Sequence, residues 1–262
     1  MNRSLLFIPA KEKMLGKIVT FNADKYIIDL EDSIGMEEKE EALNLVVKYL
    51  KENKEEYDKL YVRINSDNFM KELKALKSFK IGFMLPKFEN VLQYQEAETI
   101  LKKHPVMALI ESPMGIVNAK EIIMLPYVES VAFGAEDYTA NVNMINDDKY
   151  LLSIKSLLVN NAKAFNKKVY DTPSFKITEE ELFKEEVKTS VELGFDGKLL
   201  IHPKHIDYIN EMFSNSDIEN MKKIVELYEK QSEAVFVLDG KVYEKMHIAR
   251  MKKIIKENGG IK

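Results

Sequence analysis

The feature that most constrains the fold is a regular alternation between short apolar runs and longer amphipathic segments. The short runs are rich in residues that favour strands, and the longer segments have the polarity pattern of helices that cover a sheet. Strands that alternate with helices in this way form a parallel sheet with crossover helices. We predict eight strands, at Leu5–Ile8, Tyr26–Leu30, Leu60–Asn65, Gly82–Leu85, Val106–Ile110, Val131–Gly134, Lys168–Asp171 and Leu199–Ile201.

Eight strand–helix units predict an α/β fold of the (β/α)8 TIM-barrel type. The chain has 262 residues, and a barrel of this kind needs about 250. No internal repeat or glycine- and serine-rich linker divides the sequence, so we predict a single barrel domain over residues 1–262. Further helices are expected over about 203–213, about 216–233 and from Lys241 onward, which makes 214–262 a C-terminal helical extension.

Composition excludes several classes of protein. Acidic residues number 43 and basic residues 39, giving a formal charge of −4, so we expect no nucleic-acid partner. The chain has no cysteine, which excludes disulfides, thiolate metal sites and a cysteine nucleophile. Because the opening MNRSLLFIPAKEK is broken by Pro9 and by charges, and no long apolar run follows, we expect no signal peptide, no membrane association and a cytoplasmic location.

Polar side chains close most of the predicted strands. In a (β/α)8 barrel the active site forms at the carboxyl ends of the strands, so these residues are the candidates for function. They belong to the second through sixth strands: Asp29, Glu31 and Asp32, then Arg63 and Asn65, then Lys87, Glu111, Glu136 and Asp137.

Arg63 is the most informative of these residues. It alternates with Val62 and Ile64, so it should point into the barrel mouth, where an unpaired guanidinium is costly and needs carboxylate partners. Several carboxylates around one mouth repel each other unless a cation lies between them, and hard oxygen ligands favour Mg²⁺, or Mn²⁺, over zinc. Taken one at a time, Glu111 and Asp137 have an alternative interpretation as helix caps.

Three other polar groups at strand ends have two interpretations each. Lys87 could form a Schiff base, although neighbouring carboxylates would keep it protonated. Lys11 could meet substrate phosphates or simply begin a solvated helix. His202, after the eighth strand, could contact substrate or order a turn.

Seven segments carry a resemblance to a known family, in order along the chain: RSLLFIPA, YIIDLEDSI, VRIN, MLPK, ALIESPMGIVNA, AFGAEDYTANV and GFDGKLLIHPKHIDYIN. Together they resemble the citrate lyase beta-subunit family, which includes malyl-CoA and citramalyl-CoA lyases and belongs to the HpcH/HpaI aldolase superfamily. The resemblance covers about residues 3–250. It implies a Mg²⁺-dependent (β/α)8 lyase that acts on a CoA or acyl-carrier thioester and forms a homo-oligomer, often a trimer.

By matching positions, the resemblance implies roles for individual residues. Metal binding falls on Glu111 and Asp137, and Arg63 both binds substrate and takes part in catalysis. Supporting or substrate contacts are expected from the remaining matched positions: Arg3, Lys11, Glu31, Asp32, Pro113, Gly134 and Ala135.

Relatives in this family also bring a carboxylate from the C-terminal segment of a neighbouring subunit into the site. The stretch LDGKVYEKMHIAR matches that segment and has Glu244 where aspartate is usual. We therefore expect reversible cleavage of a citryl-, malyl- or citramalyl-type thioester into an α-keto acid and acetyl-CoA, with Arg63 stabilising the thioester enolate and Glu244 protonating it. Three alternatives stay open: a malyl-CoA-type thioesterase, an aldolase on free hydroxy-keto acids, and a non-catalytic subunit of a lyase complex.

Overall fold

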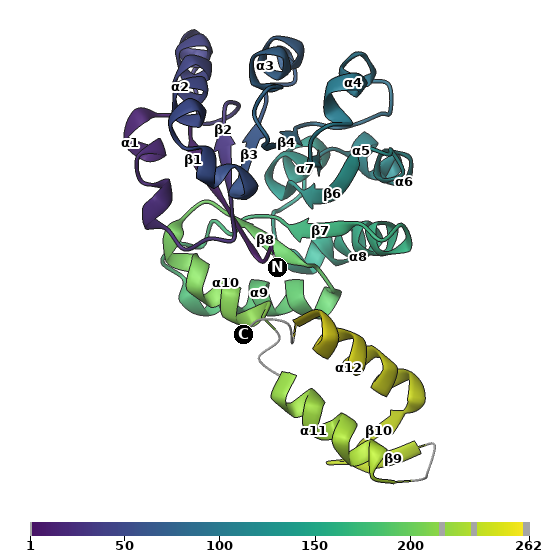
Figure 1. Ribbon diagram of the computed structural model, residues 1–262. Helices are drawn as coiled ribbons and strands as arrows, with labels where there is room; N and C mark the ends of the chain where they lie inside the picture. The colour runs from purple at the N-terminus through teal and green to yellow at the C-terminus, as the bar shows by residue number, and fades with distance from the viewer. Residues whose placement is uncertain (1, 215–217, 232–234, 259–262) are drawn as a thin grey trace. The chain divides into compact units, whose positions relative to one another are not determined.

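The computed structural model describes residues 2–214, 218–231 and 235–258. Within these residues eight strands close into a parallel barrel in sequence order (Figure 1). Strand β8 pairs with β1 to complete the circle, with Leu199 opposite Leu5. The predicted (β/α)8 TIM barrel is confirmed. The strands are β1 Ser4–Pro9, β2 Lys25–Asp29, β3 Leu60–Arg63, β4 Gly82–Leu85, β5 Val106–Ile110, β6 Val128–Phe133, β7 Lys168–Asp171 and β8 Gly197–Leu200.

The predicted strands are all present, with shifts at their ends. The largest is in β6, which begins at Val128 rather than at Val131. Glu129 interrupts the apolar run there, but its side chain is exposed on the strand and does not end it.

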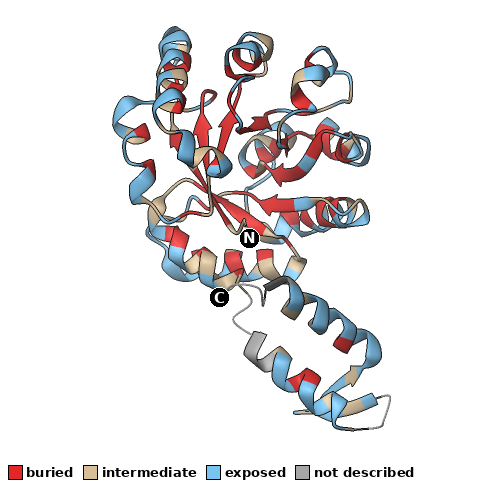
Figure 2. Cartoon of the chain, viewed as in Figure 1, coloured by how far each residue is buried: buried red, intermediate tan, exposed pale blue. Residues whose placement is uncertain are grey.

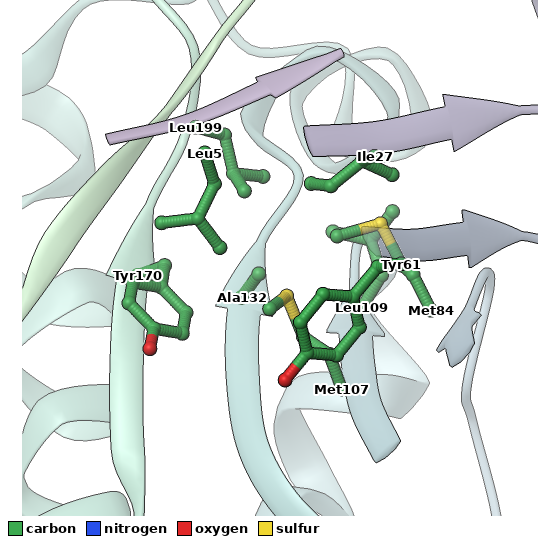
Figure 3. Packing of buried hydrophobic residues seen from close by; sticks show 9 residues of the cluster. All are labelled: Leu5, Ile27, Tyr61, Met84, Met107, Leu109, Ala132, Tyr170 and Leu199. Atoms are coloured by element: carbon green, nitrogen blue, oxygen red, sulfur yellow. The ribbon is translucent and has the colours of Figure 1, made fainter. Parts of the chain in front are cut away.

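The barrel interior is a packed apolar core. Tyr61 lies against Gly82, where a Cβ atom would come within 2.4 Å of the tyrosine ring, so only glycine fits opposite this side chain. Figure 3 shows side chains from all eight strands in this layer: Leu5, Ile27, Tyr61, Met84, Met107, Leu109, Ala132, Tyr170 and Leu199.

Helices surround the barrel and turn their polar faces outward, as the burial colouring in Figure 2 shows. Ser112 caps the helix that begins at Pro113, because its Oγ accepts a hydrogen bond from the Gly115 N–H at 3.1 Å. The α-helices of this part are α1 Glu12–Leu15, α2 Lys39–Glu52, α3 Phe69–Leu76, α4 Glu98–Leu101, α5 Pro113–Val117, α6 Ala119–Ile123, α7 Ala135–Val142, α8 Asp148–Ala164, α9 Glu180–Leu193 and α10 Ile206–Met212. The short 3₁₀ helices are η1 Ile18–Thr20, η2 Met36–Glu38, η3 Lys54–Lys59, η4 Gln95–Ala97 and η5 Pro203–His205.

A buried ionic cluster connects β7 and β8 to the helices α8 and α9 that cover them. The Asp171 Oδ2 atom lies 3.0 Å from Lys155 Nζ and 2.8 Å from Lys198 Nζ, and it accepts a hydrogen bond from Ser190 Oγ at 2.5 Å. Burial works against ionisation of Asp171, but the two lysines more than offset it, so the pKa of Asp171 is far below its ordinary value.

Residue contacts divide the chain into two compact units, with the boundary after Asn210. The second unit contains α11 Ile218–Glu229, β9 Val235–Leu238, β10 Lys241–Glu244 and α12 Lys245–Asn258. Its core contains Ile224, Val225 and Ile248.

The prediction of an all-helical extension is wrong over the start of the last segment. Strands β9 and β10 form an antiparallel hairpin, and the helix predicted from Lys241 begins at Lys245. Asp239 and Gly240 join the strands with φ of 50° and 74°, the combination that a tight hairpin turn requires. The ends of the helix predicted over 216–233 lie outside the described residues. No helix in the described parts of the chain is long and apolar enough to span a bilayer.

Candidate active site

The candidate site lies one layer beyond the barrel core, at the carboxyl ends of the strands. Successive residues in a strand point to opposite faces, so the residue two positions beyond each core side chain faces the mouth. On seven of the eight strands such residues line a cavity of about 350 Å³: Phe7, Asp29, Arg63, Glu111, Gly134, Thr172 and Ile201. On β4 the corresponding residue is Pro86, which is not among the lining residues. The other lining residues are Pro9, Asp32, Ser33, Leu109, Ala135, Glu136, Asp137, Pro173, Phe175 and Leu199.

Arg63 is tightly held on one side of this cavity. Its Nε and Nη2 atoms donate hydrogen bonds to the two carboxylate oxygens of Asp29 at 2.7 and 2.8 Å. Its Nη1 donates to Asp32 Oδ2 at 2.8 Å and lies 3.0 Å from Glu31 Oε2. The guanidinium carbon also lies 4.8 Å from the centre of the Phe7 ring. The expectation that Arg63 has carboxylate partners is confirmed.

The Asp29–Arg63 pair stays fully ionised. Burial alone would raise the pKa of Asp29, but the two hydrogen bonds and the charge of Arg63 outweigh it and leave that pKa below the ordinary value. Backbone N–H groups of Glu31 and Ser33 also donate to the Asp29 carboxylate, at 2.9 and 3.0 Å. Asp29 therefore fixes both the guanidinium and the loop that follows β2.

Glu31 joins Arg63 to a second cation. Its Oε1 lies 3.0 Å from Lys87 Nζ, although neither Glu31 oxygen has a contact with hydrogen-bond geometry. Burial raises the pKa of Glu31 despite both cations. Burial also acts to lower the pKa of Lys87, but Glu31 reverses this and raises it. A protonated Lys87 argues against the Schiff-base alternative.

Glu111 is a buried carboxylate at the end of β5. Its Oε1 accepts a hydrogen bond from the Lys87 backbone N–H at 2.7 Å. Burial, followed by the nearby charge of Glu31 and a smaller effect of Asp137, raises the pKa of Glu111 to about 8. Gly134 lies directly against it: a Cβ atom there would come within 2.6 Å of Glu111 Cβ and Oε2.

Asp137 enters the site from the first turn of α7. The residue before the helix, Gly134, has no side chain to cap it, and the Thr172 hydroxyl at the end of β7 takes that place by accepting a hydrogen bond from Ala135 N–H at 3.1 Å. Glu111 and Asp137 both border the cavity.

This arrangement fits a hard divalent cation. Acidic groups around the mouth outnumber the cations that face them: Asp29, Glu31, Asp32, Glu111 and Asp137 against Arg63 and Lys87. No group of three or more histidine, aspartate or glutamate side chains in the described residues could hold a metal alone. Mg²⁺ does not need one, because it is usually held by one or two carboxylates and completes its shell with water and substrate oxygens.

One predicted contact is corrected by the structure. Arg3 precedes β1 and lies at the amino ends of the strands, away from the cavity, where its guanidinium pairs with Asp24 at 2.8 Å and donates to the Asn210 carbonyl at 3.1 Å. A residue before a parallel strand cannot reach the mouth that forms after it, so Arg3 is not a substrate contact at this site.

The other predicted residues are placed as follows. Four of them line the cavity: Gly134, Ala135, Asp32 and Asp137. Two are not among its lining residues: Lys11, which is exposed before α1, and Pro113, the first residue of α5. Glu244 ends β10 in the second unit and is exposed.

His202 orders a turn. Its Nδ1 accepts a hydrogen bond from Lys204 N–H at 3.2 Å, as one of its two interpretations predicts.

Thr172 and Phe7 were not identified as site residues from the sequence, and Asp29 was named at the end of the second strand without a role of its own. Asp29 and Phe7 follow the core residues Ile27 and Leu5 at a spacing of two, so a strict count along each strand would have found both. Thr172 follows Tyr170 in the same way, but its capping role depends on a helix from another strand.

Comparison with known proteins agrees with this architecture. Residues 3–203 match the HpcH/HpaI aldolase/citrate lyase family. The chain belongs to this family. Among similar proteins, the citrate lyase subunit beta of Leuconostoc mesenteroides subsp. cremoris is 28% identical over 98% of this chain and 93% of its own length. A (3S)-malyl-CoA thioesterase of Cereibacter sphaeroides is 29% identical over 94% of this chain and 90% of its own length.

Solved structures of this family share the fold. The citrate lyase beta subunit of M. tuberculosis, complexed with oxaloacetate and magnesium, is 28% identical and matches 81% of this chain and 96% of its own with a TM-score of 0.71. Protein CitE from Mycobacterium tuberculosis, in a complex with magnesium, acetoacetate and coenzyme A, covers 98% of both chains with a TM-score of 0.83, and at 22% identity it shows the fold alone.

Proposed function

We propose that this protein is a Mg²⁺-dependent carbon–carbon lyase that cleaves, or forms, a 3-hydroxyacyl thioester of the citryl, malyl or citramalyl type. The products of cleavage are an α-keto acid and an acetyl thioester, which is acetyl-CoA when CoA is the carrier. The observation that carries the proposal is Glu111: a buried carboxylate with a pKa of about 8 that lines the same cavity as Asp137 and Arg63. Such a group is poorly stabilised as an anion unless a cation joins it.

Glu111 and Asp137 would hold the cation. We propose Mg²⁺, with Mn²⁺ as a substitute for it. When bound, the cation supplies a Lewis acid for the carboxylate and the adjacent oxygen of a hydroxy or keto acid. Relatives support this choice, because M. tuberculosis structures at 27–28% identity contain magnesium with oxaloacetate or with pyruvate.

Arg63 would stabilise the negative charge that develops on the thioester fragment when the carbon–carbon bond breaks. Asp29 occupies one edge of the guanidinium and holds it in place, so the guanidinium itself need not move during the reaction. The bond to Asp32 is exchangeable, since the Asp32 side chain is 57% exposed and can turn to solvent when a substrate oxygen arrives.

A base removes the proton of the substrate hydroxyl as the carbon–carbon bond breaks, and protonation of the enolate completes the reaction. We assign this protonation to Glu244, supplied by another copy of the chain in a homo-oligomer. The family resemblance implies that this oligomer is a trimer. The acyl carrier of the thioester is CoA or a carrier protein.

Incubation of the purified protein with Mg²⁺ and a panel of citryl-, malyl- and citramalyl-CoA tests the proposal, with products followed by mass spectrometry. We expect a keto acid and acetyl-CoA from at least one thioester, loss of turnover in EDTA, and recovery when Mg²⁺ is returned. Turnover that persists after thorough metal removal would contradict the assigned role of Glu111 and Asp137.

A second activity has specific support from the (3S)-malyl-CoA thioesterases, which are 28–29% identical over 94% of this chain. The same site would then release free hydroxy acid and CoA without breaking a carbon–carbon bond. The panel distinguishes the two reactions, since hydrolysis accumulates hydroxy acid and lyase activity accumulates keto acid.

A further inference from the structure

Lys87 has an unusual backbone conformation next to the site. Its φ of 49° lies in the left-handed region, which a residue with a Cβ atom seldom adopts without support. Residues with such conformations persist only where surrounding contacts hold them, and they concentrate at functional sites.

The side chain of Gln93 supplies that support. Its Nε2 donates to the Lys87 carbonyl at 2.8 Å, and its Oε1 accepts from the Glu89 N–H at 2.9 Å. The Tyr94 hydroxyl, fully buried, donates to the Pro86 carbonyl at 2.6 Å. The peptide units on either side of Lys87 are therefore both fixed.

The conformation of Lys87 determines a hydrogen bond to Glu111. In this conformation the Lys87 N–H points at Glu111 Oε1, 2.7 Å away. The other oxygen, Oε2, lies on the side of Gly134, which borders the cavity and precedes the helix that carries Asp137. One carboxylate oxygen is thus occupied by the backbone, and the other is turned toward the mouth.

We propose that Gln93 is a positioning residue for the metal site: it holds Lys87 in the left-handed conformation so that the Lys87 N–H orients Glu111 and leaves Oε2 for the cation. This inference rests on the proposed role of Glu111 as a Mg²⁺ ligand. It assigns a function to the loop after β4 that does not involve the Lys87 ammonium.

Gln93→Glu tests the inference, with Gln95→Glu as the matched control. The substituted Gln93 side chain keeps its shape and its acceptor for Glu89, but it no longer donates to the Lys87 carbonyl. Gln95 is exposed two residues away, so its substitution adds the same charge nearby without touching Lys87. The negative charge added by Gln93→Glu would by itself attract Mg²⁺. Weaker Mg²⁺ binding in this variant therefore reports the loss of the Lys87 geometry that orients Glu111. Gln93→Met provides an uncharged second variant.

Mg²⁺ dissociation constants are measured by titration calorimetry, and melting temperatures in EDTA report stability. We expect Gln93→Glu and Gln93→Met to bind Mg²⁺ about tenfold more weakly than wild type and Gln95→Glu, as for other residues that orient a metal ligand. In a Lys87→Gly background, where the left-handed conformation costs little, the loss from Gln93→Glu should be smaller.

The outcomes separate this inference from the proposed function. Wild-type protein that binds no Mg²⁺ overturns the metal site and the inference with it. Wild-type protein that binds Mg²⁺, with equal affinity in the Gln93 variants and in Gln95→Glu, overturns the inference alone. If the melting temperature of the Gln93 variants falls in proportion to their lost Mg²⁺ affinity, Gln93 has only a structural role. That result would also overturn the inference.

Discussion

At the scale of single residues, Asp29 holds Arg63, the residue to which we assign stabilisation of the enolate. The guanidinium is buried and is bound through two hydrogen bonds to one carboxylate. Removing the guanidinium would leave Asp29 as a buried, unpaired charge, so folding stability depends on Arg63 as well.

For Arg63→Ala we expect both loss of turnover and a fall in the free energy of unfolding of about 3–5 kcal/mol, the usual cost of breaking a buried ion pair. Urea unfolding and kcat/KM measure the two effects. Arg3→Ala is the control, because it also breaks an arginine–aspartate pair but at the opposite end of the barrel. Near wild-type turnover in Arg63→Ala would refute its assigned role.

Glu111 should make the metal-free protein less stable as pH rises. Its folded-state pKa of about 8 lies above the ordinary value of 4.5, so its contribution is fully present below about pH 4.5 and is lost as pH rises through about 8. Glu111→Gln removes this ionisation. We expect the variant in EDTA to be at least as stable as wild type at pH 8 and to gain no stability from Mg²⁺, as measured by thermal melting. A Mg²⁺-dependent gain in the variant equal to that of wild type would contradict the ligand assignment.

At the scale of secondary-structure elements, the site depends on close contact between the ends of β5 and β6. Gly134 permits this contact, since a Cβ atom would lie 2.6 Å from Glu111. The same glycine directly precedes α7, whose first turn carries Asp137. One residue thus sets the separation of the two proposed ligands.

Gly134→Ala should therefore displace Glu111, with a stability cost of about 1–3 kcal/mol from overpacking and weaker Mg²⁺ binding. Gly16→Ala is a suitable control, because the added methyl would meet its nearest neighbour at an ordinary 3.6 Å. Chemical unfolding and Mg²⁺ calorimetry measure the effects. Unchanged Mg²⁺ affinity in Gly134→Ala would show that this contact does not position the ligand.

Element-level prediction from the sequence succeeded where local pattern and fold agree. The eight strands were predictable because their buried runs are short and are separated by clear helix signals. The β9–β10 hairpin was missed because it lies outside the barrel pattern, and its strands expose Val235, Val237 and Val242 although VFVL reads as an apolar run. The Asp239–Gly240 pair was the available signal.

At the scale of the whole molecule, the barrel converts sequence spacing into a site. Strand ends far apart in the chain meet at one mouth, which is why Arg63, Glu111 and Asp137 could be grouped before the structure was known. The geometry within the group was not predictable in the same way. The Asp29 bidentate pair and the cap from Thr172 depend on contacts between different strands, and the left-handed Lys87 depends on the side chain of Gln93 in the same loop. Arg3 was misplaced because a shared motif gave its position in the sequence but not the end of the strand on which it lies.

The most direct test of the account is to locate a cation in crystals of the protein grown with Mn²⁺, using anomalous scattering at the manganese edge. The account predicts one strong peak within bonding distance of carboxylate oxygens from both Glu111 and Asp137, on the cavity side of Arg63. Crystals that diffract well and show no peak there, or a peak bound by neither carboxylate, would contradict it.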